Sequence, residues 1–240
     1  MTPSVPLDAP FETLIDHART TFGPVEFQSM EAGGVTLDIP QIADMPAYID
    51  KLVGRAGDKG VELPLWAKVW PSAMLLAALI PRLPGGDGDH LLEVGAGVGV
   101  CGLFAAAAGF DVTITDVEPD ALAFARMAVL KNGLEDRVQV RRADFTKDSL
   151  DRTYRYILGC EVVFEPAMYP GLGAFLLKHL DRRLDAEIIL AMENRSTAGQ
   201  FFEPLKDEVD MMRMEAPLAD GPDGEARCAL VHRLRRKHGA

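Results

Sequence analysis

The sequence predicts an α/β fold, in which a doubly wound, Rossmann-like sheet of seven mostly parallel strands ends in an antiparallel C-terminal hairpin. Three observations predict this fold. Strand-like and helical segments alternate from residue 91 to residue 208, as in parallel sheets with right-handed crossover helices. A glycine-rich turn follows the first of these strands. The last two strand-like segments, 210–216 and 227–234, are joined by a loop too short for a crossover helix, so they should pair antiparallel.

An N-terminal extension over residues 1–62 should pack on a core domain over residues 63–240. Its elements follow from apolar spacing and from turn and cap residues. We expect a helix from Phe11 to Pro24, strands at 25–30 and 35–39 around a Gly33-Gly34 turn, and a helix from Asp44 to Gly54.

The core domain opens with both tryptophans of the chain, Trp66 and Trp70. Pro71 follows at the start of an apolar helix, where its missing N–H would have no partner anyway. The strands expected after it are 91–94, 112–115, 138–142, 156–160 and 187–192, and the helices are 73–79, 100–108, 120–130, 169–180 and 198–208.

The chain is organised around the glycine-rich turn after the apolar strand 91–94. Gly95, Gly97 and Gly99 lack the side chains that would keep a ligand away from the backbone. The helix that begins near Val100 should direct its free N–H groups at that ligand. This arrangement predicts a site for a nucleotide-like cofactor.

Acidic residues close to strand ends should meet at one edge of the sheet, where open α/β folds bind ligands. They are Glu93, Asp116, Asp144 and Glu161. We expect Asp116 to accept hydrogen bonds from both ribose hydroxyls of the cofactor. Asp144 could accept a hydrogen bond from the amino group of an adenine, with Phe145 beside the ring. Alternatively, Asp144 could serve only as a helix cap or turn residue.

Composition and charge exclude several classes of function. The formal net charge of −11 argues against unaided binding to nucleic acid or to anionic membranes. The three cysteines are far apart in the sequence and form no metal-ligand or redox pattern, which predicts neither a disulfide nor a metal site. The N-terminus lacks a secretory signal, and no apolar window is long enough to cross a membrane. We expect a cytoplasmic protein, as a monomer rather than an obligate oligomer.

The sequence Glu93-Val-Gly95-Ala-Gly97-Val-Gly99, followed by Asp116, resembles the S-adenosylmethionine site of class I, seven-stranded methyltransferases. Two further stretches, Pro64 to Ser72 and Gly159 to Pro166, resemble the lysine protein methyltransferases that modify chaperones, elongation factors and the electron-transfer flavoprotein β-subunit. The resemblance covers residues 62 to 235. It implies S-adenosylmethionine as cofactor and a protein lysine as acceptor.

The motif after the strand 156–160 most often carries Asp and Tyr in that family, whereas this chain has Glu161 and Phe164. The resemblance implies that these two residues serve the acceptor amine, which Glu161 would orient or deprotonate through water. Trp70 should contact the ligand, although it could instead pack in the core. For Trp66, a place in the core is as plausible as a ligand contact. Glu161 could instead be a solvated loop acid, and Phe164 a packing residue.

Three other functions remain open from the residues alone. A small-molecule N- or O-methyltransferase would share the fold and the cofactor. An NAD(P) oxidoreductase would use the same glycine spacing, although Glu93 would face the ammonium of a methionine moiety well and would repel a pyrophosphate. A non-catalytic binding module would bind cofactor poorly.

Overall fold

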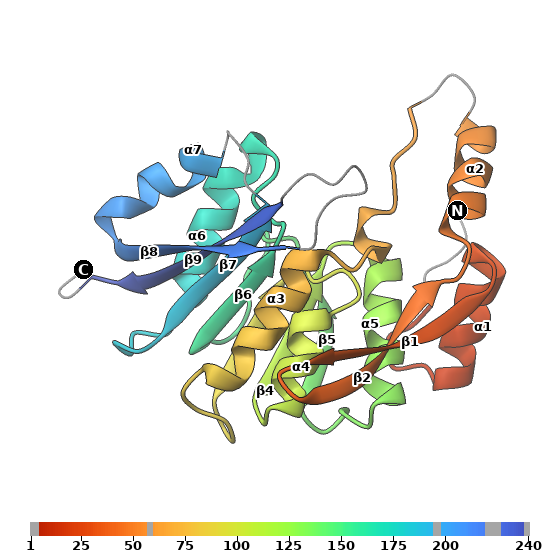
Figure 1. Ribbon diagram of the computed structural model, residues 1–240, viewed down its shortest axis with the longest axis horizontal. Coiled ribbons are helices and arrows are strands. Elements are labelled where there is room, and N and C mark those ends of the chain that lie inside the picture. Colours follow the sequence, from red (N-terminus) through yellow and green to blue (C-terminus); the bar gives the residue numbers. More distant parts are fainter. Residues whose placement is uncertain (1–4, 57–59, 194–197, 219–226, 238–240) are drawn as a thin grey trace.

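The computed structural model describes residues 5–56, 60–193, 198–218 and 227–237. Its main sheet has seven strands in the order β5-β4-β3-β6-β7-β9-β8. The first five of these run parallel, β9 is antiparallel to both of its neighbours, and so β8 points the same way as the first five (Figure 1). This confirms the predicted fold class. The strands are β3 (His90–Val94), β4 (Asp111–Asp116), β5 (Val138–Arg142), β6 (Tyr156–Cys160), β7 (Glu187–Glu193), β8 (Val209–Pro217) and β9 (Cys228–Arg236).

Helices cover both faces of the sheet because strand side chains alternate between two cores. In β3, Leu91 belongs to the core that contains α3, α4 and α5, whereas Leu92 and Val94 belong to the core that contains α6 and α7. Both cores are made of fully buried apolar residues. The helices are α3 (Pro71–Leu79), α4 (Val100–Ala107), α5 (Pro119–Lys131), α6 (Tyr169–His179) and α7 (Ala198–Phe202).

The N-terminal residues form a separate layer against α4 and α5, at one end of the molecule (Figure 1). A two-stranded antiparallel hairpin turns at the expected glycines, and the Asp44 side chain accepts the N–H of Ala47, as expected of a cap. The rings of Phe22, Trp66 and Phe124 pack edge to face with centroids 5.2 to 5.6 Å apart, so the layer shares the core of the main domain. Its elements are α1 (Phe11–Phe22), β1 (Val25–Ala32), β2 (Val35–Ile42) and α2 (Met45–Ala56).

One predicted helix is shorter than expected. The expected helix 198–208 is α-helical only to Phe202 and continues as 3-10 turns over Glu203–Asp207. Pro204 explains the change, since proline has no N–H for the carbonyl of Gln200 and its ring crowds that carbonyl. The loop 219–226, expected to join the C-terminal strands, lies outside the described residues. No helix in the described ranges is long and apolar enough to cross a membrane.

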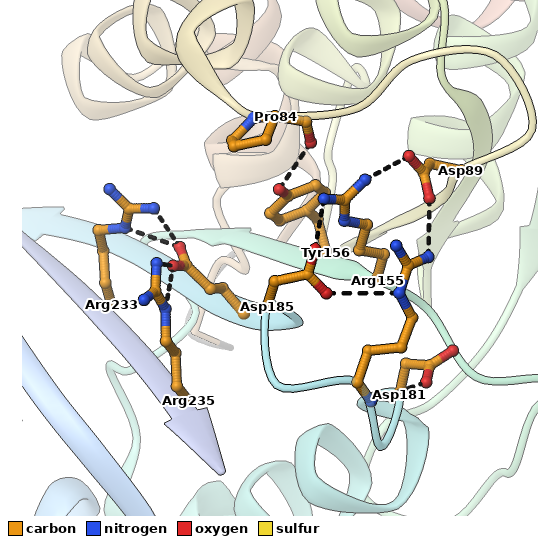
Figure 2. Close-up of polar contacts among 10 residues, drawn as sticks. Pro84, Asp89, Arg155, Tyr156, Asp181, Asp185, Arg233 and Arg235 are labelled. Atoms are coloured by element: carbon orange, nitrogen blue, oxygen red, sulfur yellow. Dashed lines mark hydrogen bonds and ion pairs between the residues drawn. The ribbon is translucent and has the colours of Figure 1, made fainter.

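Ion pairs tie together the edge of the sheet where the parallel strands begin (Figure 2). The guanidinium of Arg155, at 9% exposure, contacts both Asp89 and Asp185, and Asp89 also accepts from Arg183 at 3.0 Å. Burial acts to raise the pKa of Asp89, but the two guanidinium groups together outweigh it and lower that pKa. These ion pairs hold together the segments that lead into β3, β6 and β7.

His232 of β9 is a buried histidine that stays neutral in the fold. Its ring stacks on Phe202 with the centroids 4.1 Å apart, and its Nδ1 atom is buried without a hydrogen-bond partner in the described structure. Burial, followed by the nearby charge of Arg213, lowers the pKa of His232 to about 4. Protonation of this ring therefore opposes folding.

Stability should fall in acid partly because of His232. The unfolded chain binds a proton at this residue near pH 6.5, whereas the folded chain does so only near pH 4, so stability is lost as pH falls through that window. From about pH 8 to about pH 5, wild type should lose about 2 kcal/mol more than His232→Leu. Urea unfolding of both proteins at both pH values measures the difference, and equal losses would contradict the assigned cause.

Candidate active site

A cavity of about 610 Å³ opens at the carboxyl ends of β3, β4 and β6. This is the edge at which open α/β sheets bind ligands, and the volume suits a molecule of cofactor size. The N-terminal layer, the segment before α3 and the loop after β6 complete the walls. Residues that line the cavity include Phe22, Tyr48, Leu63, Trp66, Trp70, Glu93, Gly95, Gly97, Asp116, Val117, Phe145, Glu161 and Phe164.

The glycine turn needs its glycines for conformation and for packing. Gly95, Gly97 and Gly99 have φ angles of 56°, 55° and 81°, in the left-handed region that L-residues with side chains rarely adopt. A Cβ atom on Gly97 would lie 2.6 Å from the carbonyl oxygen of Trp66. The turn thus packs directly against the tryptophan segment, a contact that the sequence pattern alone did not indicate.

The buried carboxylate of Glu93 holds the first turn of α4. One oxygen accepts the N–H of Cys101 at 3.1 Å, and the other accepts the N–H of Gly102 at 2.7 Å. We expected the first N–H groups of this helix to point at a ligand. That expectation is wrong for these two groups, because Glu93 satisfies them from inside the fold. Burial raises the pKa of Glu93 to about 7, although both N–H groups lower it.

Asp116 lies at the end of β4 with its carboxylate on the cavity wall. Its two oxygens accept the N–H of Gly97 at 2.8 Å and the N–H of Glu118 at 3.0 Å. Burial raises the pKa of Asp116, whereas these two N–H groups act in the opposite direction. A carboxylate oxygen can accept more than one hydrogen bond, so the side chain can hold the glycine turn and still serve a ligand.

Asp144 takes the second of the two roles considered for it. Its carboxylate accepts the N–H and the hydroxyl of Thr146 and pairs with Lys147 at 2.9 Å. These contacts, the Thr146 hydroxyl first, lower the pKa of Asp144 to about 2. Its side chain closes a turn and does not line the cavity, so the expected adenine contact receives no support. The neighbouring Phe145 does line the cavity.

Glu161 is held in a strained conformation at the end of β6. Its φ angle of 56° is the only positive value of a non-glycine residue in the described chain, a feature that clusters at functional sites. One carboxylate oxygen accepts the hydroxyl of Ser72 at 2.7 Å and the backbone N–H of Glu193 at 2.9 Å. The side chain is buried on the cavity wall, so the alternative of a solvated loop acid is wrong.

The aromatic residues divide between core and cavity mouth. Trp66 packs on Phe22 and Phe124, and therefore takes the core role considered for it while also lining the cavity. Phe164 is 47% exposed at the mouth. Trp70 lines the cavity, and the Nζ atom of Lys68 lies 4.1 Å from the centroid of its ring.

Sequence reasoning missed several contributors to the site. Ser72 was noted only as part of a motif, although its hydroxyl binds the carboxylate of Glu161. Phe22 and Tyr48 come from the N-terminal layer, for which no motif was recognised. No local signal identifies such contacts, which join residues far apart in the chain.

The cavity carries strong negative charge. Its only basic lining residue in the described chain is Lys68, whereas six acidic residues line it: Glu62, Glu93, Asp116, Glu118, Asp120 and Glu161. Burial, then Asp116 and Glu62, raises the pKa of Glu118. Such a lining attracts a cationic ligand and repels a pyrophosphate, which disfavours the NAD(P) alternative. The described residues contain no group of three or more side chains suited to a metal ion.

Comparison with known proteins places the chain among methyltransferases. The sequence model of a family described as lysine methyltransferase matches residues 59–208. The protein N-lysine methyltransferase METTL21A of Xenopus tropicalis is 32% identical over 169 residues, which are 66% of this chain and 72% of the relative. METTL21A of Danio rerio is 36% identical over 145 residues, 57% of this chain and 64% of that relative.

Solved structures agree at the level of fold. The N-methyltransferase NodS from Bradyrhizobium japonicum WM9, in complex with S-adenosylhomocysteine, has a TM-score of 0.55 at 15% identity and covers 68% of this chain and 85% of its own. A TehB-like S-adenosylmethionine-dependent methyltransferase from Corynebacterium glutamicum has a TM-score of 0.52 at 17% identity, over 81% of this chain and 99% of its own.

Gly97→Ala should destabilise the protein by about 2–4 kcal/mol, since it combines a left-handed residue with a clash against the Trp66 carbonyl. Gly133→Ala is the matched control. Gly133 has a φ of 64°, and a Cβ there would meet nothing within 4 Å, so only the conformational term of about 1 kcal/mol applies. Urea unfolding compares the two variants. Equal losses would contradict the role of the Trp66 contact.

Proposed function

This chain belongs to the lysine methyltransferase family, and from that premise we propose that its cavity holds S-adenosylmethionine next to an incoming lysine side chain, with Glu161 and Phe164 serving the amine. The family membership makes the chain an S-adenosylmethionine-dependent protein-lysine methyltransferase. The single observation that carries the residue assignment is the strained, buried Glu161 on the wall of an acidic cavity. When bound, the cofactor supplies an electrophilic methyl group on a sulfonium.

The lining of the cavity fits that cofactor. Asp116 would accept the ribose hydroxyls, and Gly95 and Gly97 would allow the ligand to approach the backbone. Glu93 lines the cavity while its oxygens accept the N–H groups of Cys101 and Gly102, and it would add partial negative charge near the ammonium of the methionine moiety. Phe145 and Trp70 offer aromatic surfaces, the first for the adenine ring.

Glu161 and Phe164 would prepare the acceptor. A lysine amine must be neutral to act as a nucleophile, and a carboxylate can accept its proton through a water molecule. Ser72 and the backbone of Glu193 hold the Glu161 carboxylate in place. Less conformational entropy is then lost when the carboxylate orients the amine. Phe164 at the mouth would exclude water and attract the cationic amine to its ring face.

The setting of the enzyme is also a proposal. The thiols of Cys101, Cys160 and Cys228 are free, a state that a reducing compartment such as the cytoplasm preserves. The net charge of −11 supports a protein partner in preference to a nucleic acid. We also propose that the protein acts as a monomer.

S-Adenosylhomocysteine should bind the wild-type protein, and NADH should not raise its melting temperature. Asp116→Asn should weaken S-adenosylhomocysteine binding about 10- to 100-fold, because the amide replaces a charged acceptor of hydrogen bonds. Asp144→Asn is the control, since its carboxylate serves only a turn. Isothermal calorimetry measures both. Unchanged affinity in Asp116→Asn would contradict the assignment of Asp116 to the ribose. Absence of binding to the wild-type protein would contradict the proposed cofactor site.

Glu161→Gln should lower the rate of methyl transfer about 100-fold or more, through loss of a proton acceptor and of charge next to the amine. Phe164→Ala should lower it less, mainly through a higher KM. Transfer of labelled methyl groups to lysate proteins measures the rates. Calorimetry with S-adenosylhomocysteine confirms that each variant still folds and binds. If both variants transfer methyl groups at the wild-type rate, neither residue serves the acceptor.

A further inference from the structure

Resting on the proposed methyl transfer to a protein lysine at this cavity, we propose that the cavity mouth selects a lysine in an exposed chain segment that also carries a large apolar residue and a basic residue next to it. We define the mouth as Glu62, Leu63, Leu65 and Phe164, which line the cavity, together with Glu165, which follows Phe164 in the chain. The partner is defined by its chemistry, apolar and cationic around the acceptor lysine.

Exposed apolar side chains gather at the mouth. Eight large apolar residues are exposed in the described part of the chain, and four of them line this one cavity: Leu63, Leu65, Val117 and Phe164. Val117 follows Asp116 on the side proposed for the ribose, and the proposal assigns Leu63, Leu65 and Phe164 to the acceptor. Each of these three is about half exposed. Apolar surface concentrated at a binding cavity indicates contact with an apolar group of the partner.

Negative charge flanks this apolar surface. Glu62 directly precedes Leu63 and Glu165 directly follows Phe164, and both side chains are exposed. Neither side chain makes an ion pair or hydrogen bond within the described ranges. Lys68 is the one basic residue on the cavity wall in the described chain, and its charge lies over the Trp70 ring. The mouth therefore complements a cationic segment and repels an acidic one.

The two halves of the mouth are held together at the proposed acceptor site. Leu63 and Leu65 lie on the segment that leads into α3, and Phe164 lies on the loop after β6. The hydrogen bond from Ser72 of α3 to Glu161 links these segments directly at the carboxylate proposed to serve the amine. In this proposal, an apolar neighbour of the acceptor lysine contacts this surface while the amine lies at Glu161.

Two short peptides with a central lysine test the proposal. In the first peptide, leucine and arginine flank the lysine, and in the second peptide, serine and glutamate take their places. Methyl transfer from labelled S-adenosylmethionine is measured with wild type, with the double variant Leu63→Ser/Leu65→Ser and with Leu184→Ser. Leu184 is the matched control because it is a similarly exposed leucine at the opposite edge of the sheet.

Wild type should favour the leucine–arginine peptide by about tenfold or more in kcat/KM, the size expected for one buried apolar side chain with favourable charge. The double variant should lose most of this preference through a higher KM, with kcat and S-adenosylhomocysteine affinity unchanged, whereas Leu184→Ser should behave as wild type. Glu62→Gln/Glu165→Gln should reduce discrimination against the glutamate-containing peptide.

Other outcomes overturn the proposal. Equal rates on both peptides, or a preference that survives in the double variant, would show that the mouth does not select by this chemistry. Transfer to lysate proteins with no transfer to either peptide would show that recognition requires a folded surface and not a local segment. Absence of transfer to peptides and lysate proteins alike, despite cofactor binding, would remove the proposed function as well, and is thereby distinguished from the other failures.

Discussion

The ligand edge of this protein depends on one buried carboxylate. Glu93 leaves β3 pointing under the glycine turn and captures the backbone N–H groups of Cys101 and Gly102. A buried carboxylate is tolerated only when such donors surround it, so these two hydrogen bonds hold the end of the strand against the start of α4. Asp116, at the end of β4, likewise accepts a backbone N–H, that of Gly97 in the turn. Glu93 and Asp116 thus hold the glycine turn in place without any contribution from a ligand.

Glu161 has a corresponding place at the end of β6, on the side proposed for the acceptor. Its carboxylate joins α3 through Ser72 and β7 through the backbone of Glu193, so three elements that are remote in sequence converge on one side chain. The left-handed backbone of Glu161 is the local strain that this convergence requires. With the acid and the glycine turn both held by hydrogen bonds, the proposed acceptor and cofactor sides of the cavity have a fixed relation, as catalysis by proximity and orientation requires.

Much of the fold could be predicted from the sequence because local signals agree with the global arrangement. Apolar runs, glycine turns and caps locate every strand of the sheet, and the short C-terminal connection predicts its antiparallel edge. The helix from Ala198 was overestimated because Pro204 stops the α-helix while apolar spacing continues.

The site was less predictable, since Asp116 and Asp144 occupy equivalent places near strand ends. Their roles differ because Asp144 has Thr146 and Lys147 nearby, whereas Asp116 accepts the N–H of Gly97 from the turn after β3. Contacts over such sequence distances have no local signature.

The wall contributed by Phe22, Tyr48 and Leu52 has a consequence for how such an enzyme can diversify. These residues come from outside the segment 59–208 that the family shares. The strand ends that border the cavity and this part of its wall therefore come from different stretches of the chain. Because Phe22 also packs on Trp66 and Phe124, a substitution that reshapes this side of the chamber would have to preserve those ring contacts.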